Sequence, residues 1–166
     1  LENIKNGDIS IILGNFDGLH KGHQKLLAEL KKQASLNNLK PLALVFKIAP
    51  KAIIKKQETS VILEDKERLK LFQDIEVKFL DFNKIKDISC NDFFTLLIKK
   101  YKMGGFLCGR DFAFGKERKG NIPFLREVCK QNNIKLFIID FLQDNNGIKV
   151  SSSRLRKCLA EGNFAE

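Results

Sequence analysis

Short apolar runs alternate with amphipathic runs along this chain, and that alternation limits its fold more than any other feature. Five runs favour β-strands: 9–13, 42–46, 76–80, 105–108 and 136–139. Runs that are apolar at successive positions are typical of parallel strands buried on both faces. The sequence therefore predicts an α/β domain of three layers, with a mainly parallel sheet between helices.

Apolar residues between these runs recur at helical spacing. Helices are predicted over residues 23–35, 65–74 and 91–103, from Pro123 onward, and over 154–161. The second of these helices should turn Leu69 and Phe72 inward. The third should end at Gly104 in a left-handed cap.

Length and cysteine spacing exclude several classes of protein. A chain of 166 residues corresponds to about one domain. No apolar run approaches the ~18 residues of a membrane span, and no signal peptide is recognisable. The cysteines are well separated and form no C-x-x-C pair: Cys90, Cys108, Cys129 and Cys158. This spacing argues against zinc and disulfides and predicts reduced, buried thiols in a cytoplasmic protein.

The net charge of +10, from 30 Lys and Arg against 20 Asp and Glu, invites a nucleic-acid hypothesis. The cations are spread along the chain, however, and no aromatic RNA-binding motif accompanies them. Solvated helix faces, or steering of an anionic substrate, explain the charge better. We therefore expect neither nucleic acid nor a membrane as a partner, and keep nucleic-acid binding as an alternative.

Ligands of such folds bind at the carboxyl ends of the strands. The loops there are 14–22, 46–50, 109–120 and 149–153. The first runs from the opening strand into the first helix and holds both histidines of the chain, His20 and His23. Its glycines allow tight turns and leave room for a phosphate at the helix N-terminus, where free N–H groups and a partial positive charge lie.

A metal pair is the alternative for the two histidines. It needs a third ligand, and only Asp17 is near in sequence. The loop contains no dinucleotide-binding or Walker glycine pattern.

The third of these loops, at 109–120, mixes glycines, cations and two phenylalanines. Exposed Phe112 and Phe114 in a loop would cover or stack on a ligand. Asp111, a carboxylate among cations, is a candidate Mg²⁺ ligand. A basic surface loop is the simpler alternative.

The segment 149–156 enters the last helix with three serines and two arginines. One serine suffices to cap a helix, and Arg in a first turn opposes the helix dipole. Ser151, Ser152 and Ser153, with Arg154 and Arg156, therefore form a dense set of phosphate donors.

Three of these segments together resemble a known family. The run from Gly14 to His23 resembles the G-x-F-D-G-x-H-x-G-H signature of nucleotidylyltransferases, and 150–156 resembles their I-S-S-T-x-x-R signature. The run from Gly109 to Asn121, G-R-D-F-A-F-G-K-x-x-x-G-N, is similar to a motif of bacterial FAD synthetases. The resemblance is to the FMN adenylyltransferase module of bifunctional riboflavin kinase/FAD synthetases, with a Rossmann-like nucleotidylyltransferase fold.

The resemblance implies transfer of AMP from ATP to FMN, giving FAD and pyrophosphate, with Mg²⁺ accompanying ATP. It implies catalytic roles for His20, His23 and Arg156, and a metal-binding role for Asp111. Nucleotide-binding residues would be Gly14, Asn15, Phe16, Asp17, Gly18, Gly22, Ser151, Ser152 and Ser153. Flavin-binding residues would be Phe46, Phe112, Phe114 and Gly115.

One loop departs from the family pattern. The family usually carries Phe-acid-Pro-His-Pro after the second strand, whereas this chain has Phe46-Lys47-Ile48-Ala49-Pro50. Since that loop shapes the acceptor pocket in the family, we expect weaker flavin binding with ATP binding retained. Two alternatives are a related nucleotidylyltransferase with another phosphorylated acceptor and a degenerate nucleotide- or flavin-binding domain.

The expected domain covers residues 1–162. Residues 163–166 would begin a linker to a riboflavin kinase domain that this chain does not contain. Such a domain on a longer chain would be a further partner, and kinase activity is expected only with it.

Overall fold

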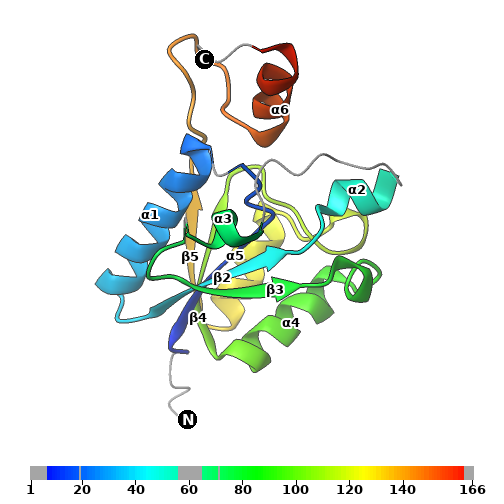
Figure 1. Ribbon diagram of the computed structural model, residues 1–166. Coiled ribbons are helices and arrows are strands. Elements are labelled where there is room, and N and C mark those ends of the chain that lie inside the picture. The colour runs from blue at the N-terminus through cyan, green and yellow to red at the C-terminus, as the bar shows by residue number, and fades with distance from the viewer. Residues whose placement is uncertain (1–6, 19, 56–64, 71, 163–166) are drawn as a thin grey trace, which may run out of the picture.

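A computed structural model describes residues 7–18, 20–55, 65–70 and 72–162. Five parallel strands form one sheet in the order β3-β2-β1-β4-β5 (Figure 1). The strands are β1 (Ile9–Gly14), β2 (Lys40–Phe46), β3 (Glu76–Leu80), β4 (Met103–Gly109) and β5 (Lys135–Ile139). The helices are α1 (Lys21–Leu36), α2 (Pro50–Lys55), α3 (Asp65–Lys70), α4 (Cys90–Tyr101), α5 (Ile122–Gln131) and α6 (Ser152–Glu161), with short 3₁₀ turns η1 (Phe82–Lys84) and η2 (Lys116–Arg118). The predicted α/β fold is confirmed, and the predicted linker 163–166 lies outside the described residues.

Both faces of the sheet are covered, because successive strand residues point to opposite sides. Ile11 and Leu13 of β1 join the core beneath α4 and α5, whereas Ile12 joins the core beneath α1. Strands β2 and β4 divide in the same way. This double burial is the physical reason that the strands read as continuous apolar runs.

Two helix details differ from the sequence prediction. Helix α3 stops at Lys70, so Leu69 is 40% exposed instead of inward, and Arg68 is buried in its place. The Arg68 guanidinium lies over the Phe79 ring and its Nη1 donates to the carbonyl of Asn15. A short helix anchored by an arginine gives no apolar periodicity that a sequence could reveal.

Helix α4 ends one turn earlier than predicted, because Lys102 and not Gly104 adopts the left-handed conformation. Gly104 lies inside β4, where a Cβ atom would come within 1.9 Å of the Gly7 carbonyl oxygen. This glycine is required for close approach of two backbones, a reason that depends on tertiary structure.

Helix α6 stands over the carboxyl edge of the sheet, at the end of the segment that follows β5 (Figure 1). None of its residues is buried. Its position is therefore held by polar contacts with the loops below it and not by a hydrophobic core.

In the described part of the chain no helix is long and apolar enough to cross a membrane. Cys108 and Cys129 are buried, and burial raises the pKa of both thiols to about 12. Cys90 and Cys158 are half-buried, so the prediction of buried thiols is correct for two of the four cysteines.

Candidate functional site

A cleft of about 300 Å³ opens at the carboxyl edge of the sheet. It is lined by the loop after β1, the end of β4, the segment after β5 and the start of α6. The sequence-predicted residues that line it are His20, Gly22, His23, Asp111, Ser151, Ser152 and Ser153. Segments up to about 130 positions apart thus meet where the parallel topology requires.

His20 and His23 lie against each other at the N-terminus of α1. His20 caps the helix, because its Nδ1 accepts a hydrogen bond of 3.3 Å from the backbone N–H of His23. The two rings stack with centroids 3.8 Å apart. Gly22 permits this arrangement, since a Cβ there would lie 3.0 Å from His20 Nδ1.

Both imidazoles are neutral at pH 7. Burial, reinforced by His20, lowers the pKa of His23 to about 3. Burial, reinforced by the Lys149 charge, also lowers the pKa of His20. Each ring therefore carries one N–H donor and no charge, which suits hydrogen bonding to an anion that supplies the charge itself.

Two buried polar atoms of the first loop have no hydrogen-bond partner among the described residues, His23 Nδ1 and Asn15 Oδ1. A buried polar atom left unpaired costs about 1–3 kcal/mol. Such atoms are normally satisfied by protein, water or ligand. The loop is thus equipped to hydrogen-bond a molecule that enters the cleft.

Phe16 supports the histidines from behind. Its side chain is buried, with its ring centroid 5.1 Å from that of His23 and 5.5 Å from that of Phe72. Gly14 makes room for it, since a Cβ there would lie 2.9 Å from the Phe16 ring. Gly18, with φ of +75°, allows the chain to turn back toward His20. Phe16 and Gly14 therefore shape the loop without lining the cleft.

The serines and Arg156 fasten α6 to the first loop. Ser151 caps α6, as its Oγ accepts from the Arg154 backbone N–H at 3.3 Å. The Ser152 hydroxyl donates to the Asp17 carbonyl at 3.0 Å. Arg156 forms an ion pair with the Asp17 carboxylate, whose side chain is only 6% exposed. Asp17, predicted to contact nucleotide, instead joins two segments of the site in this structure.

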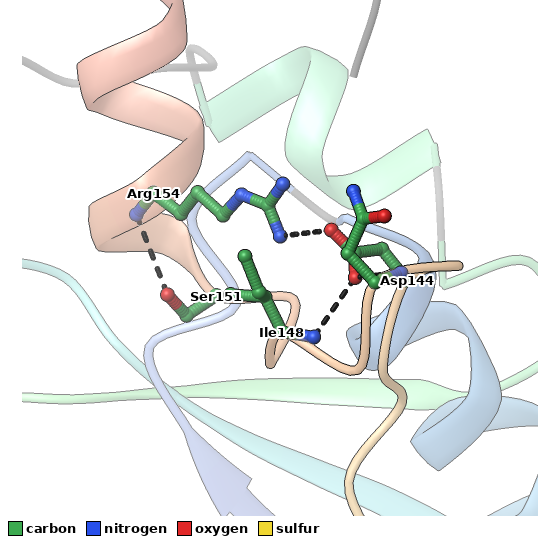
Figure 2. A network of polar contacts seen from close by, with 5 residues as sticks. Asp144, Ile148, Ser151 and Arg154 are labelled. Atoms are coloured by element: carbon green, nitrogen blue, oxygen red, sulfur yellow. Dashed lines mark hydrogen bonds and ion pairs between the residues drawn. The ribbon is translucent and has the colours of Figure 1, made fainter.

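Sequence analysis did not single out a clamp on the other side of α6. The Asp144 carboxylate pairs with Arg154 at 2.6 Å and accepts from the Ile148 backbone N–H at 2.8 Å (Figure 2). These hydrogen bonds, the backbone one first, lower the pKa of Asp144. An isolated aspartate in a polar turn gave no signal of this role.

The second sequence-predicted cluster divides. Asp111 reaches the cleft and pairs with Lys149. Phe114 is only 8% exposed and packs among core rings, including Phe93 at 5.7 Å, so the expectation of an exposed ring is wrong for Phe114. Phe112 is half-buried against it, with centroids 5.6 Å apart.

The remaining two flavin candidates also lie outside the cleft lining. Gly115 has φ of +72°, and a Cβ there would lie 2.7 Å from Cys90 Cα, so close packing requires glycine. The Phe46 ring meets Phe82 edge-on at 5.7 Å. The structure therefore does not bring the four predicted flavin contacts to the cleft that the histidines line.

Acid should weaken the fold through His23. Below its ordinary pKa of 6.5, His23 takes up a proton in the unfolded chain but not in the folded one until pH falls to about 3. Stability should therefore decline as pH falls from 6.5 toward 3, by up to ~1.4 kcal/mol per pH unit from this residue. His23→Gln should flatten that decline in urea unfolding curves recorded across this range. Parallel pH profiles for the two proteins would contradict the buried, neutral state of the ring.

Comparisons with known proteins agree with this site. Residues 2–154 match the family described as FAD synthetase. A bifunctional riboflavin kinase/FMN adenylyltransferase of Buchnera aphidicola from Schizaphis graminum is 34% identical over 97% of this chain and 54% of the relative. The Escherichia coli K12 protein of the same description is 25% identical over 93% of this chain and 51% of the relative. The chain thus spans about half the length of these curated relatives.

Solved structures give the same picture of the fold. One described as a macrolide-efflux protein from Streptococcus pneumoniae superposes with a TM-score of 0.82 at 28% identity, over 95% of this chain and 52% of that one. A pantoate-beta-alanine ligase from Francisella tularensis, in complex with β-γ ATP and β-alanine, gives a TM-score of 0.60 at 13% identity, over 98% of this chain and 71% of that one. The latter likeness concerns the fold alone.

Proposed function

The chain belongs to the FAD synthetase family, and from that premise we propose that it transfers AMP from ATP to FMN, giving FAD and pyrophosphate. An oxygen of the FMN phosphate attacks the α-phosphorus of ATP, and the bond to the β-phosphate breaks. The observation that carries the proposal is the buried, unpartnered Nδ1 of His23 beside a helix N-terminus in the cleft.

The acceptor needs no general base. With a second pKa near ~6, a phosphate monoester such as FMN is mostly dianionic at pH 7. Catalysis is then positioning and stabilisation of the charge that builds on the leaving pyrophosphate. His20 and His23, neutral and stacked, would donate N–H groups to the ATP phosphates. Backbone N–H groups of the first turn of α1 would add to them.

The start of α6 would hold the leaving pyrophosphate. Ser151, Ser152 and Ser153 line the cleft, and Arg156 lies behind them on Asp17. Serine hydroxyls that accept or donate within the protein keep further hydrogen-bonding capacity for phosphate oxygens. The Arg156 charge would favour the anion across this short separation.

Asp111 fits a magnesium site of the substrate-assisted kind. No group of three or more His, Cys, Asp or Glu side chains suited to a metal occurs in the described residues. Mg²⁺ commonly binds one or two carboxylates together with substrate phosphates and water. Asp111, exposed at the cleft, would supply that carboxylate, and the ion would offset phosphate charge. We place the reaction in the cytoplasm, where ATP is available.

For the flavin we propose the rings at the ends of β2 and β4. Phe46 and Phe112 are half-buried, so each has a surface left for an isoalloxazine ring. Phe114 and Gly115 would act by holding Phe112 in place from below. Aromatic stacking would then seat FMN on the side of the cleft that Asp111 marks.

The proposal is tested by incubating the protein with FMN, ATP and Mg²⁺. FAD is measured by chromatography and pyrophosphate by a coupled reaction. Equal amounts of both products are expected. ATP binding with no FAD would contradict FMN as acceptor, and a panel of other phosphorylated acceptors, with ATP or CTP, would then be tried. The altered run from Phe46 to Pro50 is the feature that favours this second candidate.

Restoring the family pattern in that run should strengthen FMN binding. The triple variant K47E/I48P/A49H recreates Phe-acid-Pro-His-Pro at the end of β2, where Ile48 is exposed and replaceable. We expect FMN affinity to rise by about tenfold, or ~1.4 kcal/mol, with affinity for an ATP analogue unchanged. Separate titrations of the two ligands measure this. Unchanged FMN affinity would show that the departure is neutral for acceptor binding.

A further inference from the structure

One side chain at the cleft has no role in the function proposed above. Among the described lining residues, Lys149 is the only lysine or arginine. The two histidines beside it are neutral at pH 7, since burial lowers the pKa of both. The other charged lining residues are the carboxylates Asp111 and Asp140. A cleft meant for several phosphates thus has one fixed positive charge facing it.

The arginines of α6 do not take this place. Arg156 pairs with the buried carboxylate of Asp17, and Arg154 with Asp144 (Figure 2). Neither arginine lines the cleft. Their positive charges are therefore already matched by carboxylates that belong to the protein scaffold.

Lys149, in contrast, is held by a weak and replaceable partner. Its ammonium pairs with Asp111, with side chains 41% and 58% exposed. Exposed ion pairs contribute little to stability, so this one separates at low cost. The ammonium also lies 3.9 Å from the centre of the Phe141 ring, which keeps the side chain over the cleft.

A phosphate group would compete well for this lysine. Its charge of nearly −2 attracts an ammonium more strongly than the single charge of Asp111 at equal distance. Lys149 also stands at the site of the reaction, one residue from Val150, whose carbonyl lies close to Gly22, and two from the cap of α6. Its charge is near enough to His20 to lower the pKa of that ring.

We infer that Lys149 binds a phosphate of the bound substrate, exchanging Asp111 for phosphate oxygens. This inference rests on the proposed function, and it leaves Asp111 available to the magnesium ion that accompanies ATP. The phosphate belongs either to the FMN monoester or to the ATP triphosphate. Both present the same chemistry to an ammonium, and titration separates them.

The test compares Lys149→Gln and Lys149→Arg with the wild type and with Lys157→Gln. Lys157 is a matched control, an exposed lysine of α6 that lies 3.9 Å from Glu161 and away from the cleft lining. Calorimetric titrations use FMN, riboflavin, a non-hydrolysable ATP analogue and inorganic pyrophosphate. Lys149→Gln should weaken at least one phosphate-bearing ligand by about 10- to 100-fold, and Lys149→Arg should restore most of that affinity.

Riboflavin, which lacks the phosphate, should bind Lys149→Gln and the wild type alike. Loss confined to FMN assigns Lys149 to the acceptor phosphate, and loss confined to the ATP analogue and pyrophosphate assigns it to ATP. Affinities of Lys149→Gln equal to those of Lys157→Gln for every ligand would overturn the inference. Equal weakening of riboflavin and FMN would overturn it too, because that result indicates a structural role.

Failure of the inference can be told apart from failure of the proposed function. If the wild type makes FAD and Lys149→Gln binds and reacts equally well, only the inference fails. If the wild type makes no FAD but Lys149→Gln loses pyrophosphate affinity, the phosphate role of Lys149 stands and the acceptor is wrong.

Discussion

His23→Ala should lower kcat for FAD formation by about 10²- to 10³-fold, the usual effect of removing one donor from a site that stabilises developing anionic charge. His23 lies at the N-terminus of α1 with a buried Nδ1 that no described residue satisfies. The neutral ring donates a hydrogen bond without requiring protonation, because its pKa is near 3. Steady-state kinetics on the wild type and the variant measure the change.

A variant with better packing separates chemistry from folding. His23 touches Phe16 and stacks on His20, so alanine leaves a gap that disturbs both rings. His23→Asn and His23→Gln keep most of the volume and place an amide near one or other ring nitrogen. We expect one of the two to recover part of kcat. Activity of His23→Ala within about threefold of wild type, at equal thermal stability, would contradict a catalytic role.

The second large effect is expected at the ion pair between Asp17 and Arg156. Arg156→Gln leaves the Asp17 carboxylate, 6% exposed, without the charge that compensates it. Breaking a buried pair costs about 3–5 kcal/mol. For a chain of this size that corresponds to a fall of roughly 6–20 °C in Tm. Thermal unfolding followed by circular dichroism measures it.

The reciprocal variant should be milder. Asp17→Asn leaves Arg156, which at 27% side-chain exposure retains contact with water. The double variant should recover part of the stability lost in Arg156→Gln, because it removes the buried charge along with its partner. FAD formation should fall in all three, since α6 has no buried residues to hold it over the first loop. A Tm for Arg156→Gln equal to that of Lys157→Gln would show that the pair does not hold α6.

Strand and helix positions followed from local pattern alone. Four apolar runs and the weaker run at 76–80 all became strands, with β3 matching its predicted limits. The amphipathic stripe with Leu27, Leu30 and Ala34 is buried as predicted. Periodicity is imposed by which face of each element meets the core, so it is written into neighbouring residues. The placement of both histidines and the three serines at one cleft followed from parallel topology.

What the tertiary structure alone decided is which side chains meet across long separations. Asp17 and Arg156 are 139 positions apart, and Asp111 and Lys149 are 38 apart. Nothing in the local pattern distinguishes the arginine that anchors α6 from the lysine that faces the cleft. Nor does it distinguish Phe114, which is buried, from Phe112, which is half-buried. By itself the sequence determined the elements, their order and the edge of the sheet where chemistry occurs, because these depend on local periodicity and strand direction. Partners, burial and the charge left facing the cleft depend on packing between distant segments, and only the folded chain settles them.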